Sequence, residues 1–357
     1  MRVFAYKMNC MIDEGLIVRA GNQQTEILLN FNWNKVEDLK DSYSQVVLFV
    51  DENVLRLFPE LEKLGDACIK ICEGENSKSW ENTSAIIDSL LALELDRDSF
   101  FLAVGGGVVT DLVGFIASVY MRGVAFGFVP STILGAVDAS IGGKNGVNHP
   151  LAKNMVGTIN QPAFVGYDFQ LFETLSDEEF LNGLAEVLKY AFSLDIELFY
   201  FLYANQLNDL RNNREKLQWM ISRCVFIKSQ IVESDPFEKD VRKYLNFGHT
   251  IGHGIEKITG MKHGLAIVMG MYYETLLSME FGWVEEDQFE LMLSVIKHFG
   301  YSLDLSCSTT EIIEKIRMDK KRKGKAIDHI VVSYVGDCRL ERIDLEEFEF
   351  RLKKLLK

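Results

Sequence analysis

Residues 100–119 read FFLAVGGGVVTDLVGFIASV, and this stretch decides the fold class. Its first five residues have the unbroken apolar pattern of a buried strand, three glycines follow, and the remainder up to Val119 has helical character. Glycines between a strand and a helix let backbone N–H groups approach a phosphate at the positive end of the helix. The stretch gives G-x-G, but Thr110 stands where the usual dinucleotide fingerprint has a third glycine. A tight turn without a ligand is therefore the alternative.

The residues before this stretch repeat the alternation of strand and helix. Gln45–Val50 and the weaker Ala67–Cys72 have strand patterns, and Trp80–Leu95 has the pattern of an amphipathic helix. Such alternation predicts an α/β domain with a mostly parallel sheet and helices on both faces. Ligands of these sheets bind beyond the carboxyl ends of the strands, where Asp51 and the three glycines stand.

Residues 126–157 read FGFVPSTILGAVDASIGGKNGVNHPLAKNMVG and contain few stretches that would pack as regular elements. We expect a long functional loop here, because structureless segments of this length inside a compact domain usually carry function. Lys144, Lys153 and Asn154 supply cationic and amide donors, and Asp138 supplies an acceptor. A solvated surface loop is the alternative, but it fits the interspersed apolar residues poorly.

Beyond Pro162 the patterns become helical, so we predict two domains, residues 1–162 and residues 163–357. The expected helices are Asp177–Phe192, Leu198–Leu207, Glu215–Glu233, Asn246–Ile258, His263–Phe281 and Asp287–Phe299. After them come a basic cluster at residues 320–323, a hairpin formed by Ile330–Val335 and Arg339–Ile343, and a closing amphipathic helix.

Bulk composition restricts the possible partners. A chain of 357 residues with a formal net charge of -14 lacks the basic character that nucleic acid or an anionic membrane requires. The six cysteines are scattered without CxxC spacing, as in reduced intracellular proteins. Asp13 and Glu14 interrupt the segment where a signal peptide would need an apolar run, and no run is long enough to span a membrane. We therefore expect a cytoplasmic protein.

Residues 246–271, NFGHTIGHGIEKITGMKHGLAIVMGM, hold three of the six histidines. His249 and His253 share one face of a helix, and His263 follows a Thr-Gly break, which is a geometry that can hold a divalent metal. An HxxxH pair is a weak pattern, however, and a buried histidine bonded to a carbonyl is the more common case. The missing carboxylate has a natural candidate in Glu186, which with Lys189 lies inside an otherwise apolar helical run.

Five segments together resemble the 3-dehydroquinate synthase family: GGGVVTDLVGFIASVYMRG, VPSTILGAVDASIGGKNGVNHPLAKNMVG, NGLAEVLKY, LNFGHTIGHGIE and KHGLAIVMGM. They occur in the family's order and spacing, and the resemblance runs from about residue 51 to residue 324. The wider group is the sugar phosphate cyclases, and the metal-dependent glycerol dehydrogenases are more distant. The resemblance implies a Rossmann-like NAD-binding first domain and a mainly helical second domain that binds metal and substrate.

The resemblance also implies ligands for each site residue. Glu186, His249 and His263 would hold Zn²⁺, with Co²⁺ as an alternative, and His253 would face the site without binding the metal. NAD would lie against Asp51, Glu75, Lys78, Gly106, Gly107, Val108, Asp111, Ser131, Thr132, Lys144, Lys153, Leu171 and Thr174. Substrate contacts would fall on Arg122, Asp138, Lys144, Asn154, Lys189, Lys228, Arg242, Asn246, His253 and Lys320. Relatives are commonly homodimers in which the residue matching Arg122 reaches a neighbour's site.

The reaction of this family explains why these residue types would contact the substrate. A small anionic sugar-acid phosphate, 3-deoxy-D-arabino-heptulosonate 7-phosphate, is transiently oxidised by NAD, loses phosphate by β-elimination, is re-reduced, and closes a carbocycle by an aldol reaction. Lys144, Asn154, His253 and Lys320 would serve the phosphate, while Lys228 and Arg242 would serve the carboxylate. A lone lysine or arginine is more often exposed surface charge, but Lys228 and Arg242 stand just before LNFGH.

Five residues depart from the family pattern: Thr110, Ser131, Ala139, Asn145 and Leu265. Leu265 matters most, because it replaces a glutamate beside a metal histidine and so removes a charge near that ligand. Three alternatives stay open at this point. They are a sister cyclase of the 2-deoxy-scyllo-inosose or valiolone type, a metal- and NAD-dependent alcohol dehydrogenase, and a relative without catalysis.

Overall fold

The computed structural model describes residues 15–150, 152–305, 307–320 and 326–355, without the side chains of residues 152 and 318–320. The chain forms two compact units. The first runs to Ser176 and includes Ile221–Pro236; the second comprises Asp177–Met220 and continues from Phe237. The sequence places a boundary at residue 162, whereas β9 (Phe164–Gly166), just beyond it, pairs with strands of the first unit.

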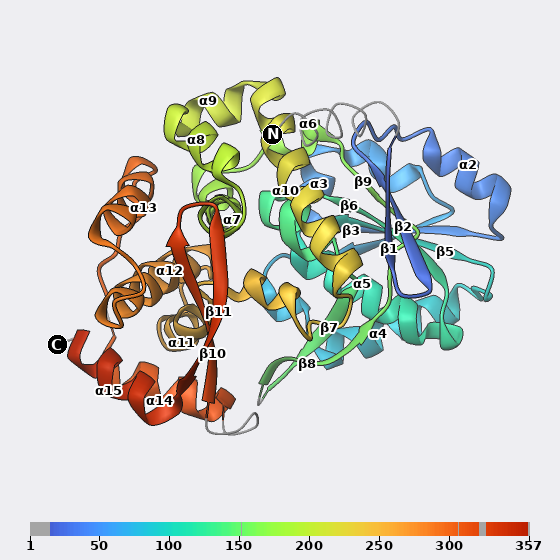
Figure 1. Ribbon diagram of the computed structural model, residues 1–357. Coiled ribbons are helices and arrows are strands. Elements are labelled where there is room, and N and C mark those ends of the chain that lie inside the picture. Colours follow the sequence, from blue (N-terminus) through green and yellow to red (C-terminus); the bar gives the residue numbers. More distant parts are fainter. Residues whose placement is uncertain (1–14, 151, 306, 321–325, 356–357) are drawn as a thin grey trace. The chain divides into compact units, whose positions relative to one another are not determined.

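A seven-stranded sheet forms the centre of the first unit (Figure 1). Its order is β1-β2-β9-β6-β5-β3-β4, and every neighbouring pair is parallel except β1 and β2. The expected mostly parallel α/β fold is therefore confirmed. The strands are β1 (Leu16–Ala20), β2 (Gln23–Leu28), β3 (Val46–Asp51), β4 (Ala67–Ile71), β5 (Phe100–Gly105), β6 (Ala125–Pro130) and β9.

Helices cover both faces of this sheet because its inner strands are apolar on both sides. Val46, Leu48 and Val50 of β3 join a core cluster that also includes residues of α2 and α3. Phe49 of β3 contacts Phe101 of β5 with tilted rings whose centroids lie 5.1 Å apart, and α5 packs against β5. Each such side chain contributes about 1.5–3 kcal/mol when fully buried. The first-unit helices are α2 (Lys35–Ser42), α3 (Glu52–Leu57), η1 (Pro59–Lys63), η2 (Glu75–Ser77), α4 (Trp80–Ala92), α5 (Gly107–Val119), η3 (Tyr120–Arg122) and α6 (Phe169–Glu173).

The expectation of an irregular loop over residues 126–157 is wrong. The segment continues β6, forms the π-helical turn η4 (Gly135–Ala139), and then makes an antiparallel hairpin of β7 (Lys144–His149) and β8 (Ala152–Ile159). Glycine weakens the strand pattern in sequence, yet Gly146 and Gly157 pair across this hairpin at close approach. The buried Val147 opposite Val156 then anchors the hairpin.

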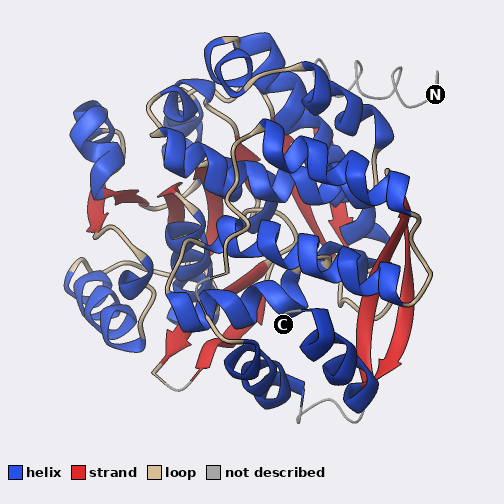
Figure 2. Ribbon diagram, turned by 90° about the vertical axis from the view of Figure 1, so that its left-hand side faces the viewer, coloured by secondary structure: helices blue, strands red, loops and turns tan. Residues whose placement is uncertain are grey.

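The second unit is mainly helical, and its hairpin of β10 and β11 is visible as the long paired strands at the right of Figure 2. Each expected helix is present within a few residues, but Asn246 belongs to the 3₁₀ turn η5, so its helix begins at His249. The elements are α7 (Asp177–Ser193), α8 (Ile196–Ala204), α9 (Leu207–Asn212), η5 (Val241–Asn246), α11 (His249–Thr259), α12 (His263–Glu280), α13 (Glu286–His298), α14 (Thr309–Lys320), β10 (Ala326–Tyr334), β11 (Asp337–Asp344) and α15 (Leu345–Leu355). α10 (Arg214–Ser234) crosses from one unit into the other.

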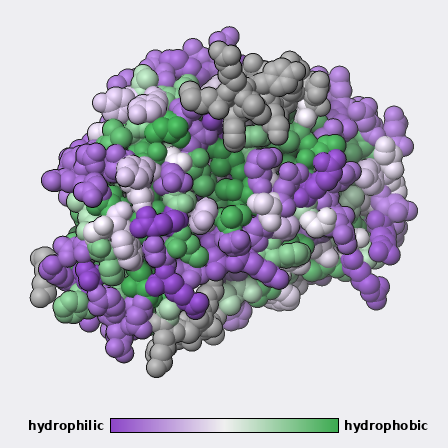
Figure 3. Space-filling model, viewed as in Figure 1, coloured by the Kyte–Doolittle hydropathy of each residue, from purple (hydrophilic) through white to green (hydrophobic). Residues whose placement is uncertain are grey.

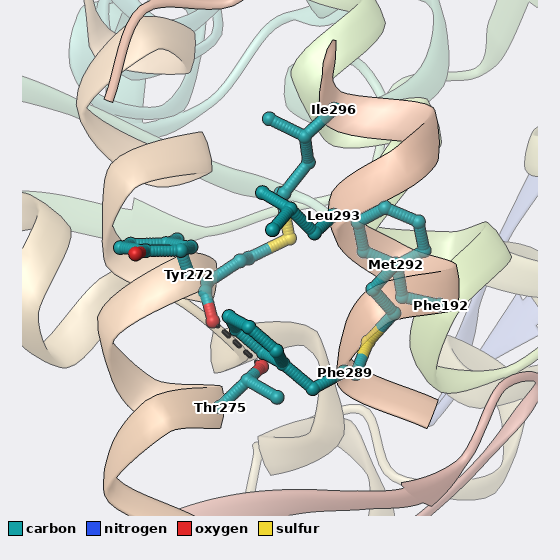
Figure 4. A pocket seen from close by; sticks show the side chains of 8 residues that line it. Phe192, Tyr272, Thr275, Phe289, Met292, Leu293 and Ile296 are labelled. Atoms are coloured by element: carbon teal, nitrogen blue, oxygen red, sulfur yellow. Dashed lines mark hydrogen bonds between the residues drawn. The ribbon is translucent and has the colours of Figure 1, made fainter. Parts of the chain in front are cut away.

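The core of the second unit contains a small apolar hollow among the described residues. The hollow is bounded by α7, α12 and α13 and has a volume of about 10 Å³, and its lining side chains point toward one another in Figure 4. Such a volume is at the lower limit for one water molecule. The hydroxyl of Thr275 already has a hydrogen-bond partner, because its Oγ1 donates to the carbonyl oxygen of Met271 at 2.8 Å. This hollow is a packing gap and offers no ligand site.

The described surface and helices have little of the continuous apolar character that a membrane-spanning protein needs. Figure 3 shows hydrophilic side chains spread over much of the visible face. Among the described residues, none of the helices combines the length and the apolar character needed to cross a bilayer.

Candidate functional site

The helix α7 carries a carboxylate into the interior of the second unit. Glu186 is fully buried on this helix, and Lys189, one turn later, is buried as well. The Lys189 ammonium donates to Oε2 of Glu186, so the two buried charges neutralise each other. This contact leaves Oε1 as the oxygen that the imidazoles approach.

His249 and His263 converge on that oxygen. Their Nε2 atoms lie 3.6 Å and 3.5 Å from Oε1 of Glu186, although the three residues come from three different helices. Ligand bonds of about 2.1 Å in a tetrahedral zinc shell would put ligand atoms about 3.4 Å apart. The donor set of one carboxylate and two imidazoles therefore fits a divalent metal in both type and spacing.

Acceptors behind both histidines fix which ring nitrogen points at Glu186. Nδ1 of His249 lies 3.1 Å from the carbonyl oxygen of Phe247, and Nδ1 of His263 lies 3.0 Å from Oε2 of Glu256. Metal-binding histidines usually donate their other N–H in this way, which holds the tautomer and the ring plane. The arrangement thus goes beyond a buried histidine bonded to a carbonyl, because the opposite nitrogens also meet at one carboxylate.

The two histidines differ in their affinity for protons. Burial lowers the pKa of His249 to about 3. Burial also acts to lower the pKa of His263, but the carboxylates of Glu186 and Glu256 outweigh it and raise that pKa to about 10. A cation held among these atoms would replace the proton of His263, since histidine must be neutral to bind a metal.

Glu256 is the residue that the sequence interpretation missed. It follows His249 by seven residues and His253 by three, so the helical spacing places all three on one face of α11. That spacing is the signal that would have revealed it. Its hydrogen bond to His263 places a carboxylate behind this histidine, although Leu265 stands where the family has a glutamate. The His253 ring lies 5.1 Å from the His249 ring and 5.8 Å from the His263 ring, so it stands beside the cluster.

In the first unit, the glycine-rich turn after β5 forms the start of α5. Gly106 is the N-cap residue, and Gly107 and Val108 open the helix without a side-chain cap. Ser131, which follows β6, donates its backbone N–H to the carbonyl of Gly105 and so ties two strand ends together. These are the carboxyl ends of parallel strands, the expected location for a nucleotide.

A buried lysine organises the same edge of the sheet. The Lys78 ammonium lies 2.5 Å from Asp111 and 2.6 Å from the side-chain oxygen of Asn154, and the Lys78 side chain is 5 % exposed. Burial raises the pKa of Asp111, and the lysine opposes that rise. Three residues expected at the NAD and phosphate positions are thus joined in one network within the first unit.

The remaining residues expected for NAD lie on several first-unit segments. Asp51 ends β3 and accepts from the N–H of Asn53, while burial raises its pKa. Glu75 accepts from Asn148, and Thr132 accepts from the N–H of Gly135. Leu171 is buried in α6, Thr174 caps the end of that helix, and Lys144 and Lys153 are exposed on β7 and β8.

The residues expected to bind substrate fall into both units, and each unit holds its own set. In the first, the Lys228 ammonium binds Asp138 at 2.7 Å, and Arg122 is exposed with a φ of 66°. In the second, Arg242 is buried, and Asn246 donates to Glu238 at 2.6 Å. The low exposure of Lys228, 5 %, contradicts the alternative that it is surface charge. The side chain of Lys320 lies outside the described part of the chain.

Comparison with known proteins identifies the family. The 3-dehydroquinate synthase N-terminal domain matches residues 68–182, and the C-terminal domain of the same family matches residues 183–322. A 3-dehydroquinate synthase of Thermodesulfovibrio yellowstonii is 40% identical over 293 residues, which are 81% of each chain. Among solved structures, a 2-deoxy-scyllo-inosose synthase has a TM-score of 0.83 at 22% identity, covering 95% of this chain and 99% of that one.

The valiolone synthase ValA of Streptomyces hygroscopicus has the same TM-score of 0.83 at 24% identity, covering 95% of this chain and 99% of its own. These two structures establish the shared fold. The sequence matches go further, since they span most of the chain and include all three residues that meet at the candidate metal site. The chain belongs to the 3-dehydroquinate synthase family.

Proposed function

We infer that this chain is a 3-dehydroquinate synthase, which converts 3-deoxy-D-arabino-heptulosonate 7-phosphate to 3-dehydroquinate and phosphate. The observation that carries the inference is the convergence of two Nε2 atoms on the buried Glu186 carboxylate, in a chain of this family. It is a phosphate-eliminating lyase with no net redox change, and its product belongs to the route to aromatic amino acids.

We propose that Glu186, His249 and His263 hold a divalent metal, Zn²⁺ or Co²⁺. When bound, such an ion lowers the pKa of the substrate hydroxyl that is oxidised and stabilises the oxygen afterwards. The chain's own contribution is the fixed donor geometry. Lys189 holds one oxygen of Glu186 in place, and Glu256 and the Phe247 carbonyl hold the two imidazole rings.

We propose that the first unit binds NAD, which supplies the hydride acceptor and returns the hydride later in the cycle. The N–H groups of Gly107 and Val108 would bind the pyrophosphate, and the start of α5 without a side-chain cap supports this role. Lys78 adds a positive charge near this turn and is held there by Asp111. Asp51, at the end of β3, is suited to bind a ribose hydroxyl.

Proton transfer and substrate binding are assigned to polar residues outside the ligand set. His253 is the candidate for assisting the proton removal that precedes phosphate loss, because it stands beside the ligand histidines. Lys228 and Arg242 are the candidates for the substrate carboxylate, and both are buried cations. A cytoplasmic location and a homodimeric state belong to the same proposal.

The sister cyclases are the second candidate, because they share the fold at a TM-score of 0.83. Their substrates lack the carboxylate, so the buried cations Lys228 and Arg242 favour the keto-acid substrate. A polyol dehydrogenase would release NADH, and it would have no use for a phosphate clamp.

One assay separates these candidates. Purified protein loaded with Zn²⁺ and NAD is mixed with the heptulosonate phosphate, and phosphate release and NADH absorbance are followed together. Phosphate release without net NADH supports the synthase. Accumulating NADH supports a dehydrogenase, and activity with glucose 6-phosphate alone supports a sister cyclase.

A further inference from the structure

The two histidine ligands share a position in their helices. His249 is the first residue of α11 and His263 is the first residue of α12. The N-cap residues are Gly248 and Lys262, and neither helix start has a side-chain cap of its own. The first N–H groups of a helix need acceptors, and a buried helix start without them is costly.

Glu274, from the middle of α12, meets this need for α11. Its Oε2 accepts from the N–H of Gly248 at 2.9 Å, and its Oε1 accepts from Thr250 and Ile251 at 3.0 Å and 3.2 Å. The Glu274 residue is 1 % exposed, and these N–H groups help to compensate the desolvation of its carboxylate. A negative charge at a helix start is also favoured by the helix dipole.

Asn182, from α7, does the same for α12. Its Oδ1 accepts from the N–H of Gly264 at 2.7 Å, directly after the ligand His263. Asn182 precedes Glu186 by four residues, so it lies one turn from the carboxylate ligand on the same helix. The contact therefore sets the start of α12 against the part of α7 that carries Glu186.

We propose that Glu274 and Asn182 are positioning residues of the metal centre, which fix His249 and His263 by capping their helices from neighbouring helices. The contacts form a chain: α7 caps α12 through Asn182, and α12 caps α11 through Glu274. Each ligand-bearing helix is thereby tied to another at the turn that carries its ligand. The inference rests on the metal site proposed above and adds the residues that set its spacing.

The test uses a matched control in the same unit. Asp195 is a buried carboxylate that caps α8 by accepting from the N–H of Leu198 at 2.8 Å, and α8 carries no proposed ligand. Glu274→Gln and Asp195→Asn each remove one charge from a buried cap. For both variants and the wild type, the Zn²⁺ Kd is measured by competition with a chromophoric chelator, and the absorption spectrum of the Co²⁺-loaded protein is recorded.

We expect Glu274→Gln to weaken Zn²⁺ binding on the order of tenfold and to shift the Co²⁺ absorption bands, as loss of a group that orients a ligand does. Asp195→Asn should leave both readouts unchanged, although it loses stability to urea. Asn182→Ala should also weaken Zn²⁺ binding. If Glu274→Gln does not fold, the Zn²⁺ Kd of Asn182→Ala tests the proposal instead. Kd values within about twofold of wild type in the folded variants would overturn the proposal, as would an equal effect of Asp195→Asn. A wild-type protein that binds no Zn²⁺ would instead remove the metal site itself.

Discussion

The chain buries charge in two different ways in its two units. In the first, Lys78 is enclosed by Asp111 and Asn154, so the cation has its partners within the protein. In the second, the Glu186 carboxylate faces Lys189 and also the Nε2 atoms of two histidines. One cluster is a closed ion pair, and the other brings three potential metal-binding side chains together at one point.

This difference separates a charge that is neutralised by partners within the protein from a donor cluster that is suited to hold a cation. A closed pair repays its desolvation only while both partners are present, so removing one leaves an isolated buried charge. In a cluster of carboxylate and imidazole donors, a bound cation offsets the free-energy cost of desolvating these groups. Variants of the first cluster should therefore change stability, and variants of the second should change metal affinity.

The largest effect is expected from Glu186→Gln. Removing the carboxylate at which both imidazoles converge should weaken Zn²⁺ binding by more than about 100-fold, beyond the range for groups that merely orient a ligand, and should abolish turnover. Chelator competition and phosphate release measure the two consequences. Glu349→Gln is the control, because Glu349 is a buried carboxylate of the same unit paired with Arg317. Retained turnover in Glu186→Gln would take Glu186 out of the site.

Lys78→Met tests the closed pair. Loss of the cation leaves Asp111 without the charge that it faces, and we expect about 3 kcal/mol less stability in urea unfolding of the NAD-free and metal-free protein. The Zn²⁺ Kd should not change. Lys70→Met is the control, since Lys70 pairs with Glu62 where both side chains are half exposed, and it should leave the urea stability nearly unchanged. Equal costs for the two variants would contradict the closed-pair interpretation.

His329 adds a pH dependence to the second unit. Its ring is 1 % exposed, Nε2 lies 2.8 Å from the Ser278 hydroxyl, and burial lowers its pKa to about 4. The pKa in the unfolded chain is about 6.5. A folded pKa below the unfolded one means that this contribution to stability is complete above about pH 6.5 and is lost as the pH falls toward 4.

Between pH 7 and pH 5 the loss from His329 should be about 2 kcal/mol. His329→Gln, which can still bond to Ser278, should lack this part of the acid destabilisation. Urea unfolding of both proteins at the two pH values, with a chelator present, measures the difference. The same acid loss in wild type and variant would assign it to other groups.

The smallest effect is expected from Glu256→Gln. The amide keeps an acceptor near Nδ1 of His263 but removes the charge, so Zn²⁺ binding should weaken about tenfold. Its urea stability without metal should stay within about 1 kcal/mol of wild type. Unchanged Zn²⁺ affinity would show that Glu256 does not take over the role of the family's glutamate at the position of Leu265.

Much of this molecule could be predicted from local patterns. Continuous apolar runs predicted β3 and β5, and the charged residues Glu186 and Lys189 stood out within an otherwise apolar helical run. The β7–β8 hairpin could not be predicted, because its glycines carry no strand signal until they meet across the hairpin. The capping roles were also hidden. Glu274 and Asn182 act on residues 26 and 82 positions away, and sequence spacing says nothing about such contacts.

Two glycines of α12 show how a position without any functional group can still be essential. A methyl group at Gly264 would lie 1.9 Å from the carbonyl oxygen of Asn182, and one at Gly270 would lie 1.9 Å from that of Gly248. Either substitution forces α12 away from a neighbouring helix. A saturation mutagenesis screen should therefore recover no tolerated residue at 264 or 270. The intolerance would arise because only glycine, whose side chain is a single hydrogen atom, lets α12 lie this close to its neighbours. The spacing of Glu186, His249 and His263 depends on that close packing.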